Sequence, residues 1–492
     1  TISLLLANSV NAKEELKTNK IDISLQECIE TALKNNLDIK IEQYNIDFSL
    51  FSLKKTEDEF SFLFGLQPSI RQGIRPTANS FVNGTSLLNE TSNNYNLYAK
   101  KKLVSGGDVS LNFDNSIFFT NSTRTDFNPS ISPKLSLGLN HPLLKNSFNG
   151  QKRIQINKND NITSGYKVKS KTIEIISSVQ NTYWDLVLTE ERLKVLKSSL
   201  ELTKDLLKIN KEKEKAGFIA KIDVLSTEAS LASKEENILQ VEKEVGNNQD
   251  RLKRILNKTS REDWQTELTP KDKPIFKTVE ANFDKMYETS LKSRPDFQIE
   301  LMELQNVVLQ KNIAEQNKLP QLDMNASAGL ESLDTNYFTA VTKLLNFQTY
   351  FWNIGLSFEI PVAGNLAETQ YKETLLRETQ QKTTIENLKQ RVFMEVKQAI
   401  RNVEINKKRV EANKFSKKLA EEQVKAETEK LNLGLSTNFQ VLQYQKSYEE
   451  AALSEVNALI DYIKSVNYLA EVEGTLLEKN NLVLEIKKIS LG

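Results

Sequence analysis

Two long tracts of this sequence contain no proline: residues 143–269 and 362–492. Both tracts are rich in Lys, Glu, Leu, Gln and Ala, which are favourable residues inside helices. Near the middle of each tract stands a glycine, Gly217 or Gly434, and glycine is the residue type that most often ends a helix. We therefore expect each tract to form two long antiparallel helices joined by a tight turn.

The apolar spacing within the first tract supports this interpretation. Leucines recur every seven residues from Leu186 to Leu207, and a second series of seven-residue steps runs from Val224 to Leu252. A repeat of seven keeps one stripe of a helix facing a partner helix. A helix over 151–214 would be about 95 Å long at 1.5 Å per residue. Such a length predicts a rod instead of a compact globule.

Outside these tracts the apolar period changes from seven to two. Alternating segments occur at 135–139, 322–330 and 352–360, with a weaker example at 62–70. Strands of about ten residues with one apolar and one polar face are typical of a β-barrel wall in a membrane. A half-buried sheet in a soluble protein gives the same alternation, so both alternatives remain open at this point. Two further segments, 95–103 and 109–113, flank a Gly-Gly turn and add a hairpin to the first half.

The composition excludes several classes of function. The chain has 66 basic and 65 acidic side chains, and a net charge of +1 does not favour nucleic acid. A single cysteine, Cys28, excludes an intrachain disulfide and a thiolate metal cluster, and we expect it to be a half-buried helix residue. A single histidine, His141, excludes a multi-histidine metal site and most histidine-based catalysis. We therefore expect no cofactor, no metal and no enzymatic activity. No apolar run of about 18 residues predicts a transmembrane helix, although barrel strands need no such run.

The chain also repeats itself. Glu30–Asp38 resembles Glu288–Asp296, and each copy is followed by alternating strands, a long helix, a glycine turn and a second long helix. A capping box beginning at Ser24 marks the start of the first helix. Residues 1–12 are predicted to be a signal-peptide remnant, or else an ordinary apolar N-terminus. The first repeat covers 22–256, with strands in 62–140 and a helical hairpin at 150–256, and a connector follows at 257–283. The second repeat covers 284–474, with strands in 322–361 and a hairpin at 365–474, and a tail follows at 475–492.

The order of these motifs, present twice, resembles the TolC-type outer-membrane efflux protein family. The resemblance rests on the helix opening 25–36, the strand ending at His141-Pro142-Leu143, and the turns 217–225 and 434–442. It implies a mainly α fold with membrane β: a trimeric α-barrel in the periplasm joined to an outer-membrane β-barrel with four strands from each chain. By repeat symmetry, 62–74 and 131–140 would be the two barrel strands of the first half. The additional hairpin would then either extend beyond the membrane or belong to a barrel larger than that of the family. The tail would pack near the connector.

The resemblance also implies partners and site residues. The partners would be two further copies in a homotrimer, a periplasmic adaptor (membrane fusion) protein, an inner-membrane RND or ABC transporter, and outer-membrane lipid. The expected adaptor-docking residues are Gly217, Phe218, Ile219, Ala220, Lys221, Gly434, Leu435, Ser436, Thr437 and Asn438. The expected gate residues are Asp223, Gln440, Gln443, Ser436 and Leu431. Gln440 and Gln443 stand where the family can carry acidic residues, which predicts weak block by cations.

These inferences favour a passive exit duct that spans the periplasm and the outer membrane and opens at its periplasmic tip. It would serve a tripartite efflux pump or a type I secretion system. The alternative is an elongated periplasmic coiled-coil adaptor or scaffold protein, which would carry only one helical hairpin. The sequence does not indicate the exported substrate.

Overall fold

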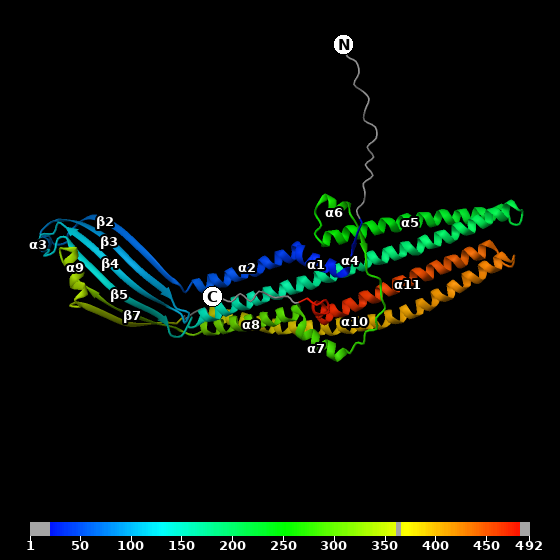
Figure 1. Cartoon of the computed structure of the whole chain (residues 1–492). Helices are drawn as coiled ribbons and strands as arrows, with labels where there is room; N and C mark the ends of the chain where they lie inside the picture. The colour runs from blue at the N-terminus through cyan, green and yellow to red at the C-terminus, as the bar shows by residue number, and fades with distance from the viewer. Residues whose placement is uncertain (1–19, 361–365, 483–492) are drawn as a thin grey trace, which may run out of the picture. The chain divides into compact units, whose positions relative to one another are not determined.

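In a computed structural model, the described residues are 20–360 and 366–482 (Figure 1). They divide into two compact units, which are considered separately here. The first contains the segment ending at Gln43, Tyr166–Phe297, and the chain from Leu388 onward. The second contains Tyr44–Gly165 and Gln298–Asn387. The predicted signal remnant, the strand end at Pro361 and most of the predicted tail lie outside the described residues.

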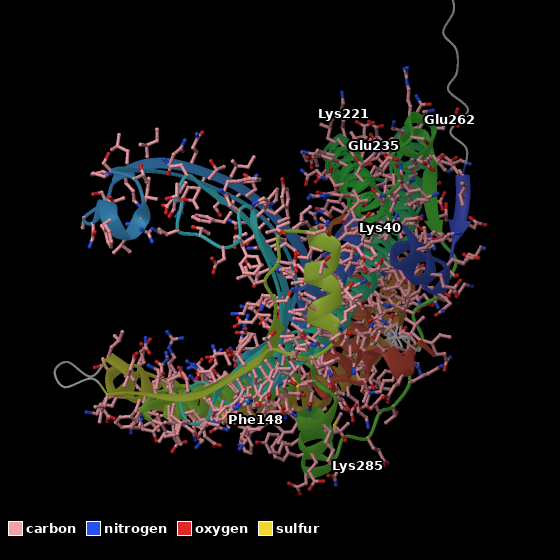
Figure 2. All side chains as sticks on the ribbon, turned by 90° about the vertical axis from the view of Figure 1, so that its left-hand side faces the viewer. Lys40, Phe148, Lys221, Glu235, Glu262 and Lys285 are labelled. Carbon is pink, nitrogen blue, oxygen red and sulfur yellow. The ribbon has the colours of Figure 1, made fainter. Side chains whose placement is uncertain are left out.

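The second unit is built on one antiparallel sheet of six strands (Figure 1). The strands, in both chain order and sheet order, are β2 (Phe62–Pro76), β3 (Leu87–Lys102), β4 (Asp108–Thr120), β5 (Ser130–Pro142), β7 (Gln321–Glu331) and β8 (Tyr350–Glu359). Two short helices, α3 (Ser80–Asn83) and α9 (Tyr337–Leu345), lie in the loops after β2 and β7. The sheet is curved and open, and side chains project from both of its faces (Figure 2).

The expectation of four strands from each chain is wrong, because the β3–β4 hairpin lies inside the sheet. β2 pairs with β3 over its whole length, from Phe62 opposite Lys101 to Pro76 opposite Leu87. The turn between β3 and β4 depends on glycine. Gly106 and Gly107 have φ angles of 103° and 74°, and a Cβ on Gly107 would lie 1.9 Å from the Asn140 carbonyl oxygen. The turn predicted from Gly-Gly therefore forms, and it inserts two strands between the expected ones.

Polar contacts join the helical segments of the second unit. These segments are parts of α2 (Leu37–Asp58, directly followed by Glu59), α4 (Asn149–Lys215), α8 (Pro295–Asn317) and α10 (Leu366–Asn432). Arg153 donates two hydrogen bonds of 3.1 Å to Glu59, and Asn159 donates one of 2.9 Å to Asn306. Lys311 pairs with Glu378 at 2.9 Å.

The first unit holds the main apolar core. Its elements include β1 (Lys20–Ile23), α1 (Leu25–Asn35), α5 (Lys221–Ile255), α6 (Arg261–Gln265), β6 (Glu267–Pro270), α7 (Phe283–Ser293), α11 (Asn438–Glu473) and α12 (Leu476–Lys479). The core gathers Ile29, Ile176, Tyr183, Leu252 and Ile460, each no more than 1% exposed. β1 and β6 pair in parallel and tie the N-terminal strand to the connector.

The capping box predicted at Ser24 is present. The Ser24 backbone amide donates to Glu27 Oε2 at 2.7 Å, and the Glu27 amide donates to Ser24 Oγ at 3.3 Å. Cys28 on this helix is fully buried instead of half-buried, because it lies on the face of α1 that packs into the core. Burial raises the pKa of its thiol to about 12.

Within residues 20–360 and 366–482, every helix is either too short or too polar to cross a bilayer.

Candidate functional site: the sheet face and the hairpin turns

The strand register places apolar side chains of all six strands on one face of the sheet. Leu66 lies opposite Leu97, Leu97 opposite Phe113, and the same row continues to Leu135, Leu330 and Tyr350. The parallel row through Ala99 runs from Phe64 to Leu111, Leu137, Ala328 and Trp352. Because cross-strand partners share a face, these residues form one continuous apolar surface, which we call the apolar sheet face.

The apolar sheet face is strongly exposed in the single chain. Phe64 is 76% exposed, Trp352 70% and Ile354 68%. The alternate residues of the same strands, such as Gln67, Asn353 and many serines and asparagines, lie on the opposite face. A continuous exposed apolar surface of this kind indicates contact with another apolar phase or partner.

The sheet also has two unpaired edges among the described residues. β2 pairs only with β3, and β8 pairs only with β7. An edge strand presents a row of backbone N–H and C=O groups that need hydrogen-bond partners. The edge strands are 15 and 10 residues long, so the unsatisfied backbone is considerable.

The hairpin turns at Gly217 and Gly434 have the same geometry. Each glycine has a left-handed φ, 76° and 75°, and nothing lies within 4 Å of a Cβ built on it. In the first turn the Gly217 amide donates to Glu214 and the Phe218 amide to Lys213, both at 2.9 Å. In the second, the Gly434 amide donates to Leu431 at 3.2 Å and the Leu435 amide to Lys430 at 2.8 Å. This pair of bonds is the Schellman motif, which ends a helix at a left-handed residue.

Most of the predicted docking residues are exposed at these turns, and several are large and apolar. Phe218 is 81% exposed and Leu435 75%. Gly217, Ala220, Lys221, Gly434 and Thr437 are also exposed, while Ile219 and Ser436 are half-buried. Asn438 differs from the rest, because it is only 6% exposed and its side chain faces other helices.

Asn438 belongs to a buried polar cluster close to the turns. The Asn210 side-chain amide donates to Asn438 Oδ1 at 2.7 Å and to Thr227 Oγ1 at 3.0 Å. The Asn438 amide donates in turn to Thr227 Oγ1 and to the Asp223 carbonyl oxygen, both at 3.0 Å. We call Asn210, Thr227 and Asn438 the tip cluster. It connects the α4–α5 hairpin to α11, so it joins the two turns of the chain.

Two further layers of polar side chains lie between the α4–α5 hairpin and α11. Thr203 donates to Gln445 at 3.3 Å, and both side chains are buried. Beyond it, Lys234 donates to Ser199 at 2.6 Å and forms an ion pair with Glu449. The side chains of this ion pair are only 11% and 13% exposed. Hydrogen bonds in such buried positions are costly to leave unmade.

The predicted gate residues do not form a single group. Leu431 is buried with Leu206 and Val441 in a small apolar cluster. Asp223 contributes its carbonyl oxygen to the tip cluster, since it accepts hydrogen bonds from Asn438 and Thr227. Gln443 is exposed, and Gln440 Oε1 lies 3.2 Å from the Ser436 hydroxyl oxygen.

Ser436 is held mainly by an acidic residue of α10. Its hydroxyl donates to Glu427 at 2.5 Å, and Lys430 pairs with the same carboxylate at 3.3 Å. The hydrogen bond from Ser436 lowers the pKa of Glu427, with a further contribution from Lys430. Glu427 is therefore a carboxylate that stabilises the second turn, although the sequence analysis did not include it.

The sequence analysis also missed the tip cluster, yet a signal for it exists. Thr227 and Lys234 are seven residues apart, and so are Asn438 and Gln445. All four side chains are buried. Polar residues that recur at heptad spacing thus mark the same helix interface as the leucine series, although a pattern of apolar residues alone does not include them. Within the described residues, no cluster of His, Cys, Asp and Glu has the arrangement of a metal site.

Comparison with known proteins identifies the family of this chain. The sequence matches the profile of the outer membrane efflux protein family over residues 110–258 and 286–475. The two matched segments cover more than half of the chain and fall in its two halves. The chain therefore belongs to the outer membrane efflux protein family, and the predicted family is confirmed. No curated protein sequence matches.

Solved structures show the same fold at low sequence identity. The CmeC outer membrane channel of Campylobacter jejuni is 18% identical, with a TM-score of 0.66 and 98% of both chains covered. VceC of Vibrio cholerae is 14% identical, with a TM-score of 0.65 over 92% of this chain and 96% of that one. The MtrE outer membrane channel of Neisseria gonorrhoeae, in its open state, is 14% identical, with a TM-score of 0.63 over 95% and 94%. The predicted fold class, mainly helical with a strand region and two repeats, is confirmed.

Proposed function

We propose that this protein is the outer-membrane exit duct of a tripartite efflux pump or of a type I secretion system. It transports passively, and its inner-membrane partner, an RND or ABC transporter, supplies the energy and selects the substrate. The apolar sheet face is the observation that carries this proposal. Its exposed Phe64, Trp352 and Ile354 suit contact with lipid, while the opposite, polar face suits a water-filled lumen.

Identical copies complete the sheet in this proposal. Strand β2 of one chain pairs with β8 of the next, because no edge strand is stable in lipid with its backbone unpaired. The family resemblance implies three copies. The six strands described in this sheet, taken from each of three chains, make a barrel of eighteen strands instead of the twelve that the resemblance implied. From strand spacing and tilt, eighteen strands give a diameter of roughly 37 Å, against roughly 25 Å for twelve.

The hairpin turns form the gate and the adaptor-docking surface in this proposal. The tip cluster holds the α4–α5 hairpin against α11 and so keeps the channel closed. A periplasmic adaptor docks on the exposed turn residues, chiefly Phe218 and Leu435, and spreads the helices. Asn438 is buried, so in this proposal it stabilises the closed tip and does not contact the adaptor.

Substitution of an exposed turn residue tests the docking surface. Phe218→Ser should strongly reduce crosslinking to the adaptor and reduce export, because a large apolar contact is lost. Phe338→Ser is the matched control, since Phe338 on α9 is 82% exposed and lies in the other unit. Equal effects of the two substitutions would contradict docking at the turns.

Planar-bilayer conductance tests the channel itself. The purified protein should insert from detergent, conduct, and show only weak block by hexamminecobalt(III), because Gln440 and Gln443 carry no charge. Gln440→Glu should strengthen the block, whereas Gln390→Glu, an exposed position of α10 far from the turn, should not. Absence of conductance, together with release by osmotic shock, would favour the alternative of a periplasmic adaptor or scaffold.

A further inference from the structure

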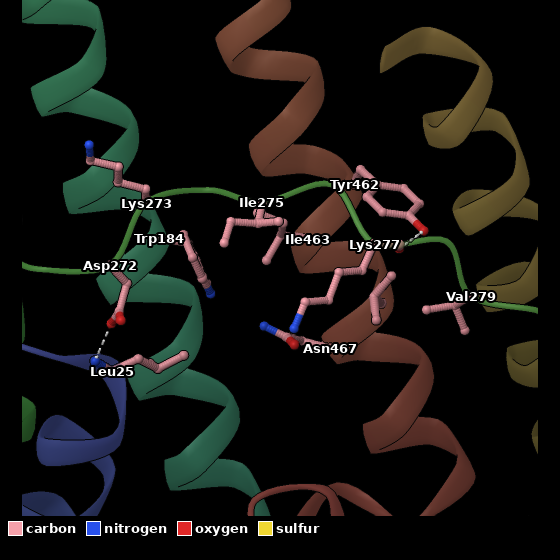
Figure 3. A pocket seen from close by; sticks show the side chains of 11 residues that line it. Leu25, Trp184, Asp272, Lys273, Ile275, Lys277, Val279, Tyr462, Ile463 and Asn467 are labelled. Atoms are coloured by element: carbon pink, nitrogen blue, oxygen red, sulfur yellow. Dashed lines mark hydrogen bonds between the residues drawn. The ribbon is translucent and has the colours of Figure 1, made fainter. Parts of the chain in front are cut away.

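A cavity in the first unit has the chemistry of a ligand site that export through the channel does not require. It has a volume of about 430 Å³ and lies between α4, α11 and the connector segment 271–279 (Figure 3). Volumes of about 300–1,000 Å³ are usual for small-molecule sites. All of the lining residues belong to one compact unit.

The connector segment is fixed at both ends of the cavity. At one end, Asp272 Oδ2 accepts hydrogen bonds of 2.7 Å from the Leu25 amide and from the Tyr183 hydroxyl. At the other end, the Tyr462 hydroxyl donates to the Lys277 carbonyl oxygen at 2.6 Å. These contacts hold the segment across the two helices, so the cavity has a preformed wall.

Two buried hydrogen-bond donors line the cavity without a partner. Trp184 is only 7% exposed, and its indole N–H makes no hydrogen bond. The side-chain nitrogen of Asn467 is likewise buried and unpaired. Figure 3 shows both nitrogen atoms directed into the cavity, with the Lys277 ammonium beside Asn467. An unpaired buried donor is unfavourable, so two at one cavity point to a ligand that supplies the acceptors.

The rest of the lining is apolar, and its one carboxylate is already engaged. Leu25, Ile275, Val279, Ile463 and Val466 contribute aliphatic side chains. The Asp272 carboxylate accepts the two hydrogen bonds described above, and both donors are groups of the protein itself. Among the described residues, the polar groups that face the cavity without a partner in the protein are the Trp184 indole N–H, the Asn467 side-chain amide and the Lys277 ammonium, set against an aliphatic wall.

We propose that this cavity binds an amphipathic organic anion: a carboxylate on a short apolar body. The carboxylate accepts hydrogen bonds from Trp184 and Asn467 and pairs with the Lys277 ammonium. The apolar body packs against Ile463 and the neighbouring aliphatic side chains. This inference rests on the cavity alone and holds whether or not the proposed gating is correct.

Calorimetric titration of the full-length protein in amphipol tests the proposal, with phenylbutyrate as the probe. We expect saturable binding of one phenylbutyrate for each chain, at least tenfold tighter than binding of the neutral phenylbutanol. Absence of saturable binding, or equal affinity for the alcohol, would overturn the proposal.

Two matched pairs of variants locate the site. Lys273 also lines the cavity, but its ammonium points away from it in Figure 3. Lys277→Gln should therefore weaken phenylbutyrate binding about tenfold, whereas Lys273→Gln should not. Trp184→Phe should also weaken binding, and Trp264→Phe, on the separate helix α6, should leave it unchanged. If Trp184→Phe proves unstable, the lysine pair alone decides. Equal losses in Lys273→Gln and Lys277→Gln would refute the site.

Discussion

Removal of the Asn438 side chain tests how the closed tip is held. Asn438→Ala deletes three hydrogen bonds: one from Asn210 at 2.7 Å, and two from the Asn438 amide to Thr227 and to the Asp223 carbonyl oxygen at 3.0 Å. The site is buried, since Asn210 is 1% exposed and Thr227 is fully buried. Water therefore does not replace these bonds without opening the interface.

The expected magnitude follows from the partners that remain. Asn210 still donates to Thr227 at 3.0 Å, and the Asp223 carbonyl oxygen still accepts from Thr227 at 2.9 Å. No buried group loses its last hydrogen-bond partner. The substitution should therefore destabilise the closed tip by the free energy of three ordinary hydrogen bonds, about 2–3 kcal/mol. If these bonds exist only in the closed state, the ratio of open to closed channels rises roughly 30- to 150-fold.

Single-channel recording in planar bilayers measures this ratio. Gln443→Ala is the matched control, because Gln443 is exposed on the same helix little more than one turn away, and it should leave the open probability unchanged. An unchanged open probability in Asn438→Ala would refute the proposal that the tip cluster keeps the channel closed. A fall in the free energy of unfolding with no change in gating would show that the cluster is structural only.

Three further predictions concern the turns and the core. Gly217→Ala should destabilise the protein by about 1 kcal/mol because φ is 76° there, whereas Gly246→Ala, in the interior of α5 with open space around it, should stabilise by a similar amount in chemical unfolding. Cys28 should resist maleimide until the first unit opens, since burial raises the pKa of its thiol to about 12; fast labelling of the folded protein would contradict the burial. The pKa of Glu427 is lowered below its ordinary value of 4.5, so its stabilising hydrogen bond is present above that pH and is lost as the pH falls through the lowered value. A spin label at Leu435→Cys should therefore gain mobility in acid, and Glu427→Gln should abolish this response.

The sequence predicted the parts of this fold that depend on local chemistry. Gly217 and Gly434 end their helices because only glycine takes a left-handed φ without steric cost, and such positions are readable without tertiary information. The capping box at Ser24 is local in the same way. The alternation in residues 322–330 and 352–360 fixed which side chains share a face, because a strand has a period of two.

Other features depend on contacts between distant segments. The place of the β3–β4 hairpin inside the sheet follows from pairing with β2 and β5, and no local pattern distinguishes that from a hairpin outside the sheet. The tip cluster joins Asn210 to Asn438 across 228 positions of sequence. The heptad spacing of Thr227 and Asn438 marks the helix interface, but it does not indicate which distant residue each side chain binds. The cavity at Trp184 is likewise formed by the connector, whose course the sequence did not indicate.

The assembly of identical chains into one closed sheet is the central claim, and native mass spectrometry of the protein released from detergent micelles tests it most directly. Each chain exposes the apolar sheet face and two unpaired edge strands, so the account predicts a particle of three chains that requires detergent or lipid. A single chain that stays soluble and folded without detergent would contradict it.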